Sequence, residues 1–226
     1  MKRFNVLIFL SILLLFSCKQ MQQQNGQQQM GGNNQPGQNG QQQSEYTDIQ
    51  KALKDSSKVM GLRLSQKKLT SLPPEISKLT NMQSIGLGEN EFTTFPVELC
   101  YLSNLQAINI SQNKIKNLPP EILKLTNLQS IALGENEFTT FPLELCQLTN
   151  LQAINLCQNK IKNLPPEIGN LTKLRFLSLG KNLLTSLPKE MAKLTNLQTL
   201  NIDGNNISSQ EKDKIKALLP KCTINY

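Results

Sequence analysis

Thiols and carboxylates are the side chains of this sequence that could carry out chemistry. Its 226 residues include five cysteines and 16 acidic residues, but no histidine. Histidine is the commonest general base near neutral pH and a common zinc ligand, so its absence argues against a hydrolase or a zinc enzyme. The cysteine spacing fits no metal-binding motif. We therefore expect no enzymatic activity, no cofactor and no metal site.

The charge of the chain is moderately basic. Lysine and arginine number 24 against 16 acidic residues, which gives a formal net charge of +8. Part of this excess lies in Lys2 and Arg3, and elsewhere lysines alternate with glutamates. Nucleic-acid-binding proteins usually gather basic residues in one patch or stripe. We therefore expect no nucleic acid among the partners.

An apolar run from Phe4 to Phe16 follows the basic start. A membrane-spanning helix needs about 20 apolar residues, and this run is shorter. A positive start before a short apolar run is typical of an export signal. We assign residues 1–17 to a signal peptide and expect an exported protein.

The end of the run, Leu15-Phe16-Ser17-Cys18, resembles a bacterial lipobox. Ser17 and Cys18 match that motif, whereas Phe16 is larger than the residue usual at its place. The resemblance implies a lipid anchor on Cys18. Because Lys19 and not an aspartate follows, it also implies the outer membrane or cell surface. The alternative is an ordinary signal peptide with an incidental cysteine.

Residues 18–44 continue almost entirely in glutamine, asparagine and glycine after Cys18. Such a segment cannot bury enough apolar surface to offset the entropy lost on ordering. We expect a disordered tether with a root-mean-square length of about 30 Å. It would space a folded domain from the lipid anchor.

From residue 59 the sequence repeats with a period of 23 residues. The unit that starts at Leu105 reads LQAINISQNKIKNLPPEILKLTN. This unit resembles the LPxE type of leucine-rich repeat. The resemblance covers residues 59–207 as seven units, the last of them truncated. Asparagine recurs at one place in six units, at Asn90, Asn113, Asn136, Asn159, Asn182 and Asn205.

The resemblance implies an α/β fold, a leucine-rich repeat solenoid with a parallel sheet on its concave face. Alternating apolar residues such as Ile108 and Ile110 mark one short strand per unit. Short helical or 3-10 turns on the convex side would begin near Pro119 and Pro120. The asparagines would satisfy backbone groups and form a buried column. No unit can bury its apolar residues alone, so the units must stack.

Both ends of such a stack need a cover. Residues 45–58 have the amphipathic pattern of an N-terminal helical cap. Residues 208–226 are expected to form the C-terminal cap. There, Ser208 or Ser209 precedes a helical pattern with Ile215 on its apolar face, and Pro220 ends it.

Two adjacent units are duplicated together, because residues 81–126 and 127–172 differ at only nine of 46 positions. The duplication places Glu91, Lys114, Glu137 and Lys160 at one place in successive units. Neighbouring strands lie about 4.8 Å apart. We therefore expect a ladder of alternating charge along one rim, which avoids repulsion between like charges.

The third, fifth and seventh residues of each unit are expected on the concave face, and most are small and neutral. The candidate protein-binding residues on this face are Phe176, Arg63, Asn109, Asn155, Asn201 and Asp203. Phe176 follows Arg175, and aromatic residues and arginine are enriched at binding hot spots. The alternative is that Phe176 only packs on Ala153 and Thr199.

These features predict a lipid-anchored protein of the bacterial cell envelope that binds another protein through its concave face. The fold alone does not establish this function. The alternative is a structural or self-associating envelope protein without a specific foreign partner.

Overall fold

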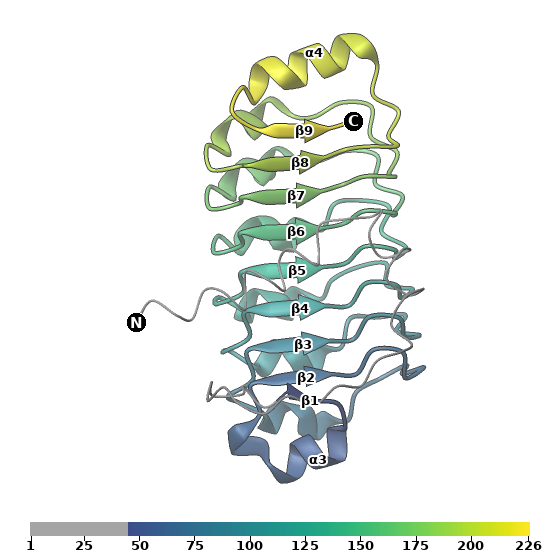
Figure 1. Ribbon diagram of the computed structural model, residues 1–226, viewed down its shortest axis with the longest axis vertical. Coiled ribbons are helices and arrows are strands. Elements are labelled where there is room, and N and C mark those ends of the chain that lie inside the picture. Colours follow the sequence, from purple (N-terminus) through teal and green to yellow (C-terminus); the bar gives the residue numbers. More distant parts are fainter. Residues whose placement is uncertain (1–44) are drawn as a thin grey trace, which may run out of the picture.

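The computed structural model describes residues 45–226. Within this range, nine parallel strands form one sheet in chain order (Figure 1). The strands are β1 (Glu45–Tyr46), β2 (Gly61–Arg63), β3 (Ser84–Gly86), β4 (Ala107–Asn109), β5 (Ser130–Ala132), β6 (Ala153–Asn155), β7 (Phe176–Ser178), β8 (Thr199–Asn201) and β9 (Thr223–Asn225). The predicted signal peptide, lipid-modified Cys18 and tether lie outside the described residues.

The strand register follows the 23-residue period. Ala107 pairs with Ser130, and Ser130 pairs with Ala153. Side chains alternate between the two faces of a strand, so Ile108 and Ile110 point to the interior. Both are at most 1% exposed. The predicted parallel sheet, with one short strand per unit, is confirmed.

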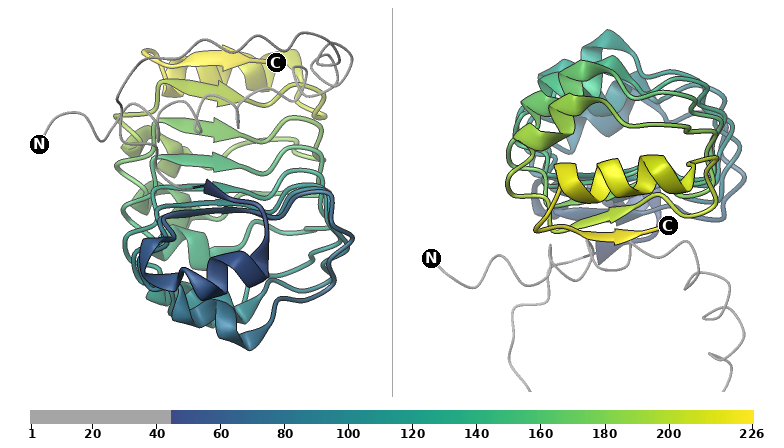
Figure 2. Two further views of the ribbon diagram at one scale, coloured as in Figure 1. Left: turned by 60° about the horizontal axis from the view of Figure 1, so that its bottom comes forward. Right: turned by 90° about the horizontal axis from the view of Figure 1, so that it is seen from above.

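Short 3-10 helices lie on the side of the stack opposite the sheet (Figure 2). They are η1 (Ser56–Lys58), η2 (Pro74–Lys78), η3 (Val97–Tyr101), η4 (Pro120–Lys124), η5 (Leu143–Gln147), η6 (Pro166–Asn170) and η7 (Lys189–Lys193). η4 begins at Pro120, as predicted, with Glu121 in its first turn. Proline suits a first position because the N–H group that it lacks would have no partner within the helix.

The units share one apolar core between the sheet and the 3-10 helices. From the unit that starts at Leu105, residues Leu105, Ile115, Ile122 and Leu125 are fully buried. The phenylalanines that replace aliphatic residues in alternate units are at most 5% exposed; they are Phe92, Phe95, Phe138 and Phe141. These aromatic rings therefore occupy core positions.

The N-terminal end of the stack carries α3 (Ile49–Lys54). A side-chain oxygen of Asp48 accepts a hydrogen bond from the Lys51 N–H at 2.8 Å, which caps the helix start. Ala52 is fully buried, and Ile49 and Leu53 pack against the core. β1 precedes this helix and pairs with β2. That two-residue strand was not predicted from the sequence.

The C-terminal end carries α4 (Ser209–Leu218), which lies across the last repeats (Figure 1). Ser208 is its N-cap, and its hydroxyl oxygen accepts from the Glu211 N–H at 3.2 Å. Ile215 is 1% exposed and reaches the core. The chain then returns as β9, and the Tyr226 hydroxyl donates to the Lys212 carbonyl of α4 at 3.0 Å. Among the described residues, no helix is long and apolar enough to cross a membrane.

Candidate protein-binding face

The asparagine column holds the strand exits of successive repeats at a fixed spacing. Asn113 Nδ2 donates to the carbonyls of Leu87, Ile110 and Ser111, each at 3.1 Å. Its Oδ1 accepts from the Phe92 N–H at 3.0 Å. Each of the other columnar asparagines likewise donates to three carbonyls and accepts from the preceding repeat; these are Asn90, Asn136, Asn159, Asn182 and Asn205. These hydrogen bonds therefore hold the strand residues just before each columnar asparagine in fixed positions.

The structure brings some of the candidate binding residues together and separates others. Asn155 on β6 and Asn201 on β8 both pair with Ser178 of β7, and Phe176 starts that same strand. Asp203 lies two residues after the end of β8. The C-terminal half of the sheet therefore groups most of the set. Asn109 on β4 lies two strands before Asn155, and Arg63 lies at the end of β2.

The strand asparagines have a structural task that sequence reasoning missed. Asn109 Oδ1 accepts from the Ser111 N–H, and Asn155 Oδ1 accepts from the Cys157 N–H, both at 3.0 Å. Asn201 Oδ1 accepts from the Asp203 N–H at the same distance. Such bonds to the backbone two residues ahead are typical of asparagine at turns. At Asn109 and Asn201, the side-chain NH₂ group is therefore the part suited to contacting a partner.

Phe176 and Arg175 act as one unit at the start of β7. The guanidinium carbon of Arg175 lies 5.5 Å from the centroid of the Phe176 ring, which is a cation–π distance. In register, Phe176 lies between Ala153 and Thr199. Phe176 is half-buried, and its ring is larger than the side chains of these two neighbours. It therefore forms an apolar protrusion on this face.

Asp203 lies against Gly180 of the preceding repeat. A Cβ atom added at Gly180 would overlap the Asp203 carboxylate. Asp203 Oδ1 is buried and has no hydrogen-bond partner among the described residues. The same seventh place alternates between glycine and a larger residue along the middle of the stack, as Gly88, Ser111, Gly134, Cys157, Gly180 and Asp203. Each glycine therefore leaves room for the larger side chain of the next repeat.

The structure also shows a polar surface just before the strands, which we call the entry rim. One column of asparagines there donates to backbone carbonyls 24 residues earlier in the chain at 2.7–2.9 Å; its members are Asn81, Asn104, Asn127, Asn150 and Asn196. A neighbouring column is formed by Gln83, Gln106, Gln129, Gln152 and Gln198. Between residues 81 and 198, a single unit departs from both columns, with Lys173 and Arg175 in place of the two amides; at the N-terminal end of the stack, the first unit has Lys58 and Met60 at these places.

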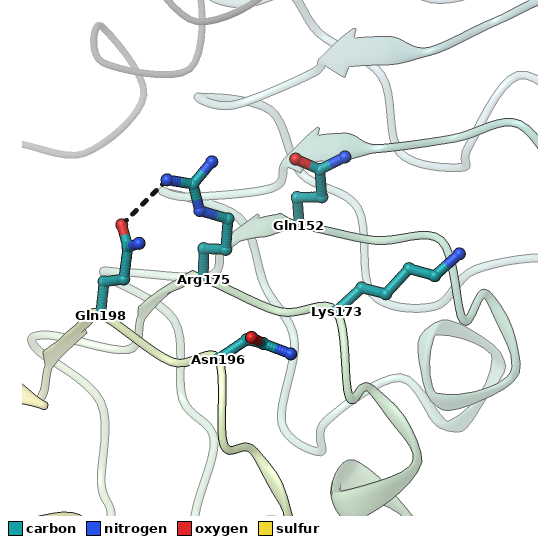
Figure 3. Close-up of a pocket in the computed structure, with 5 residues that line it drawn as sticks. All are labelled: Gln152, Lys173, Arg175, Asn196 and Gln198. Carbon is teal, nitrogen blue, oxygen red and sulfur yellow. Dashed lines mark hydrogen bonds between the residues drawn. The ribbon is translucent and has the colours of Figure 1, made fainter. Parts of the chain in front are cut away.

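These two cations line a cavity of about 250 Å³ on the entry rim (Figure 3). The lining residues are Gln152, Lys173, Arg175, Asn196 and Gln198. Arg175 turns toward Gln198 and donates to Oε1 at 3.2 Å, whereas Lys173 extends in another direction (Figure 3). Sequence reasoning noted Arg175 but missed Lys173. Comparing each place across all seven units would have found both.

The rim that follows the strands, the exit rim, carries the residues of the predicted charge ladder, but the ion pair of Glu137 lies outside that row. Stacking is as expected, since the Lys160 N–H donates to the Phe138 carbonyl one repeat earlier. In the described part of the chain, however, Glu137 pairs with Lys116 at 3.7 Å, and no ion pair joins it to Lys114 or Lys160. Long exposed side chains can reach residues outside their own row, so Glu137 pairs with Lys116, which lies diagonally across from it. With exposed fractions of 70% and 40%, this pair contributes little to stability.

The thiols of the repeats are positioned for packing and not for chemistry. Burial raises the pKa of both the Cys100 and Cys146 thiols to about 12, with nearby glutamates adding to the effect. Thiolates are the nucleophilic form, so these two side chains are poor nucleophiles. Across residues 45–226, the four cysteines form no disulfide, and no cluster of acidic and cysteine side chains could hold a metal ion.

Known proteins share both the sequence pattern and the fold. A family model described as leucine rich repeat matches residues 57–115, 103–161 and 149–207. A leucine-rich repeat protein structure from Leptospira interrogans is 40% identical, with a TM-score of 0.61, over 75% of this chain and 50% of that one. An internalin (InlF) from Listeria monocytogenes is 21% identical, with a TM-score of 0.65, over 80% of this chain and 53% of that one. The chain thus spans about half the length of either structure. No curated protein sequence matches it.

Proposed function

This chain belongs to the leucine-rich repeat family, and we propose that it binds another protein through the C-terminal half of its sheet face. We further propose that a lipid on Cys18 anchors it in a bacterial cell envelope, at the outer membrane or cell surface. Leucine-rich repeats generally serve as protein-interaction modules, and stacked repeats offer extended surfaces for this purpose. Within that surface, the observations favour the region around Phe176.

Phe176 is the observation that carries the proposed site. It pairs in register with Ala153 and Thr199, and the guanidinium of Arg175 lies over its ring. Large aromatic residues supply much of the binding energy at protein interfaces when smaller contacts surround them. The NH₂ group of Asn201 and the carboxylate of Asp203 lie on the neighbouring strand exit and supply polar contacts for orientation.

The test is affinity capture of envelope proteins on the full chain, with cross-linking before washing. Phe176→Ala is expected to reduce recovery of the captured protein at least tenfold, as the loss of a hot-spot aromatic residue would. The matched control is Tyr101→Ala, because Tyr101 is an aromatic residue with 56% exposure on η3, on the opposite side of the stack. Equal recovery by both variants would move the binding site away from Phe176.

The lipid anchor is proposed from the apolar run and the Ser17-Cys18 pair alone. Mass spectrometry of the protein extracted from its own bacterial membranes should find an N-terminal cysteine that carries acyl chains. Cys18→Ser should leave an unacylated chain in the soluble fraction. An unmodified cysteine, or cleavage at a different residue, would contradict the anchor and leave the binding proposal intact.

A self-associating envelope protein would behave differently in solution. Sedimentation velocity of the full chain in detergent, over a hundredfold range of concentration, separates the two possibilities. A constant sedimentation coefficient is expected for a protein whose partner is foreign. Growth of larger species with concentration, unaffected by Phe176→Ala, would favour the self-associating alternative.

A further inference from the structure

The unit that contains Lys173 and Arg175 departs from a repeat that is otherwise kept for structural reasons. At five equivalent places, an asparagine donates to a backbone carbonyl 24 residues earlier, in the preceding repeat or, for Asn81, in the N-terminal cap. Lys173 instead donates from Nζ to Asn150 Oδ1 at 2.6 Å. This unit therefore gives up one inter-repeat hydrogen bond to the backbone. A local departure of this kind from a consistent pattern is expected at functional positions.

The two departures are chemically alike, and the fold places them together. Each replaces a neutral amide with a cation, and both side chains line the cavity on the entry rim. None of the described residues that line this cavity is acidic. The Lys173 ammonium forms no ion pair within residues 45–226 and bonds only to the neutral Asn150. Between residues 81 and 198, the amide columns of the entry rim therefore carry two cations together only in this unit.

The arginine is also held in a defined position. Its guanidinium lies over the Phe176 ring and donates to Gln198 Oε1. A planar guanidinium fixed in this way is suited to paired hydrogen bonds with a carboxylate. Gln152, Asn196 and Gln198 add neutral amide groups around the charges (Figure 3). The cavity can therefore orient an anionic group as well as attract it.

The size of the cavity favours a side chain over a free small molecule. Pockets for small-molecule ligands usually measure about 300–1,000 Å³ and are mainly apolar. This cavity is smaller, at about 250 Å³, and all five lining residues are polar or charged. It also adjoins the ring of Phe176 through Arg175. A protein segment could thus place a carboxylate in the cavity and an apolar neighbour on the ring.

We propose that the entry-rim cavity binds the side-chain carboxylates of an acidic segment of the partner protein. Arg175 receives one carboxylate, Lys173 attracts a second, and an apolar residue between them packs on Phe176. The inference depends on the proposed protein-binding function and adds the chemistry of the partner to it.

The test uses the full chain in detergent micelles and biosensor surfaces coated with one of two blocked peptides. The probe is Gly-Glu-Leu-Glu-Gly, and its neutral counterpart is Gly-Gln-Leu-Gln-Gly. We expect binding to the glutamate surface to be at least tenfold tighter. Raising NaCl from 0.1 to 0.5 M should weaken it severalfold, because exposed charges are screened.

Two double variants test whether the entry-rim cavity is the site that binds the glutamate peptide. Lys173→Asn/Arg175→Gln restores the residues that other units use, so the fold should persist, and binding to the glutamate surface should fall at least fivefold. Lys160→Asn/Lys162→Gln removes the same charge from exposed positions on the exit rim and should bind as the unchanged protein does. Equal binding of the two peptides, or an equal loss in both double variants, would overturn the inference.

The two proposals can fail separately. If Phe176→Ala abolishes capture of the partner but Lys173→Asn/Arg175→Gln captures it undiminished, the acidic segment is wrong and the binding face stands. If the glutamate peptide binds as expected while Phe176→Ala leaves capture unchanged, the cavity has its ligand and the proposed face is wrong.

Discussion

Asn113 and Asn136 lie one repeat apart and donate from Nδ2 to the same acceptor, the Ile110 carbonyl, each at 3.1 Å. Asn136 also accepts from the Ile115 N–H at 3.0 Å, and Ile115 belongs to the repeat of Asn113. Each internal junction of the stack is bridged in the same way by an asparagine amide, which is buried at every junction except the last, where Asn205 is partly buried. The period of 23 residues is maintained by these polar bonds as well as by the apolar core.

Replacing a columnar asparagine should be far more damaging than replacing one on the entry rim. Asn136→Ala removes four hydrogen bonds and leaves buried backbone groups without partners, so we expect a loss of about 2–4 kcal/mol in the free energy of unfolding. Asn127→Ala is the control, since Asn127 is exposed and makes one bond to the Ser103 carbonyl at 2.9 Å. Urea denaturation midpoints measure both. Similar losses for the two variants would show that the column is not a main source of stability.

Backbone strain recurs at the residue just before each columnar asparagine. Five such residues have positive φ angles without being glycine; they are Glu89, Gln112, Glu135, Gln158 and Lys181. Gln66, at the equivalent place of the first unit, also has a positive φ angle, although Lys67 and not an asparagine follows it. The seventh equivalent residue is Gly204, with φ of 65°. Left-handed conformations are strained for residues with a Cβ and worst for β-branched ones.

Position 158 offers a direct test of this strain, because Gln158 has φ of 53°. Gln158→Gly should be as stable as the unchanged protein, or more stable by up to about 1 kcal/mol in the free energy of unfolding. Relief of strain in the folded state offsets the added freedom of the unfolded chain. Gln158→Val should lose about 1–3 kcal/mol. Lys160→Val, at an exposed neighbour, controls for the effect of valine itself. Equal melting temperatures for the two valine variants would contradict the expectation.

The sequence predicted those features that depend on spacing. The pairing of Ala107 with Ser130 and the burial of Ile108 follow from an uninterrupted period and an apolar core that neighbouring units share. β1 could not be predicted in this way, because Glu45 and Tyr46 lie before the repeats and pair through backbone atoms alone. The positive φ angles were not predicted either, because among these residues only Gly204 is of a type that favours a positive φ angle.

Side-chain partners were harder to predict than positions. Glu137 lies in the expected row, but its ion pair with Lys116 was not predicted, because a flexible exposed side chain can reach Lys114, Lys116 or Lys160. The entry-rim cavity depends on two departures from columns whose regularity is visible only when all units are aligned. For this fold, the informative residues are those that break an established repeat.

Alkaline pH should weaken the fold through two buried thiols. Burial raises the pKa of Cys100 and Cys146 from 9.0 to about 12. The stability that these two protonated thiols contribute is fully present below pH 9. It is lost as pH rises from 9 toward 12, because the unfolded chain then releases protons that the folded chain retains. Denaturation midpoints measured from pH 8 to pH 11 should fall less steeply for Cys100→Ala/Cys146→Ala. Alanine already occupies the equivalent place at Ala192. Parallel slopes for the two proteins would contradict this.

The contact between Gly180 and Asp203 predicts a strong coupling between substitutions at the two positions. Gly180→Ala would drive a methyl group into the Asp203 carboxylate and toward Asn201 Nδ2, so we expect a loss of about 1–3 kcal/mol. In an Asp203→Gly background the same change should cost less than about 0.5 kcal/mol, because the obstacle is gone. Gly86→Ala is the control, since its added Cβ would meet no atom closer than 3.6 Å, and its counterpart in the duplicated unit is Ala132. The alternation of glycine with a larger residue at this place keeps two larger side chains from facing each other along the middle of the stack. A double-mutant cycle measured by urea denaturation decides the matter: a coupling free energy near zero would mean that Asp203 moves aside without cost.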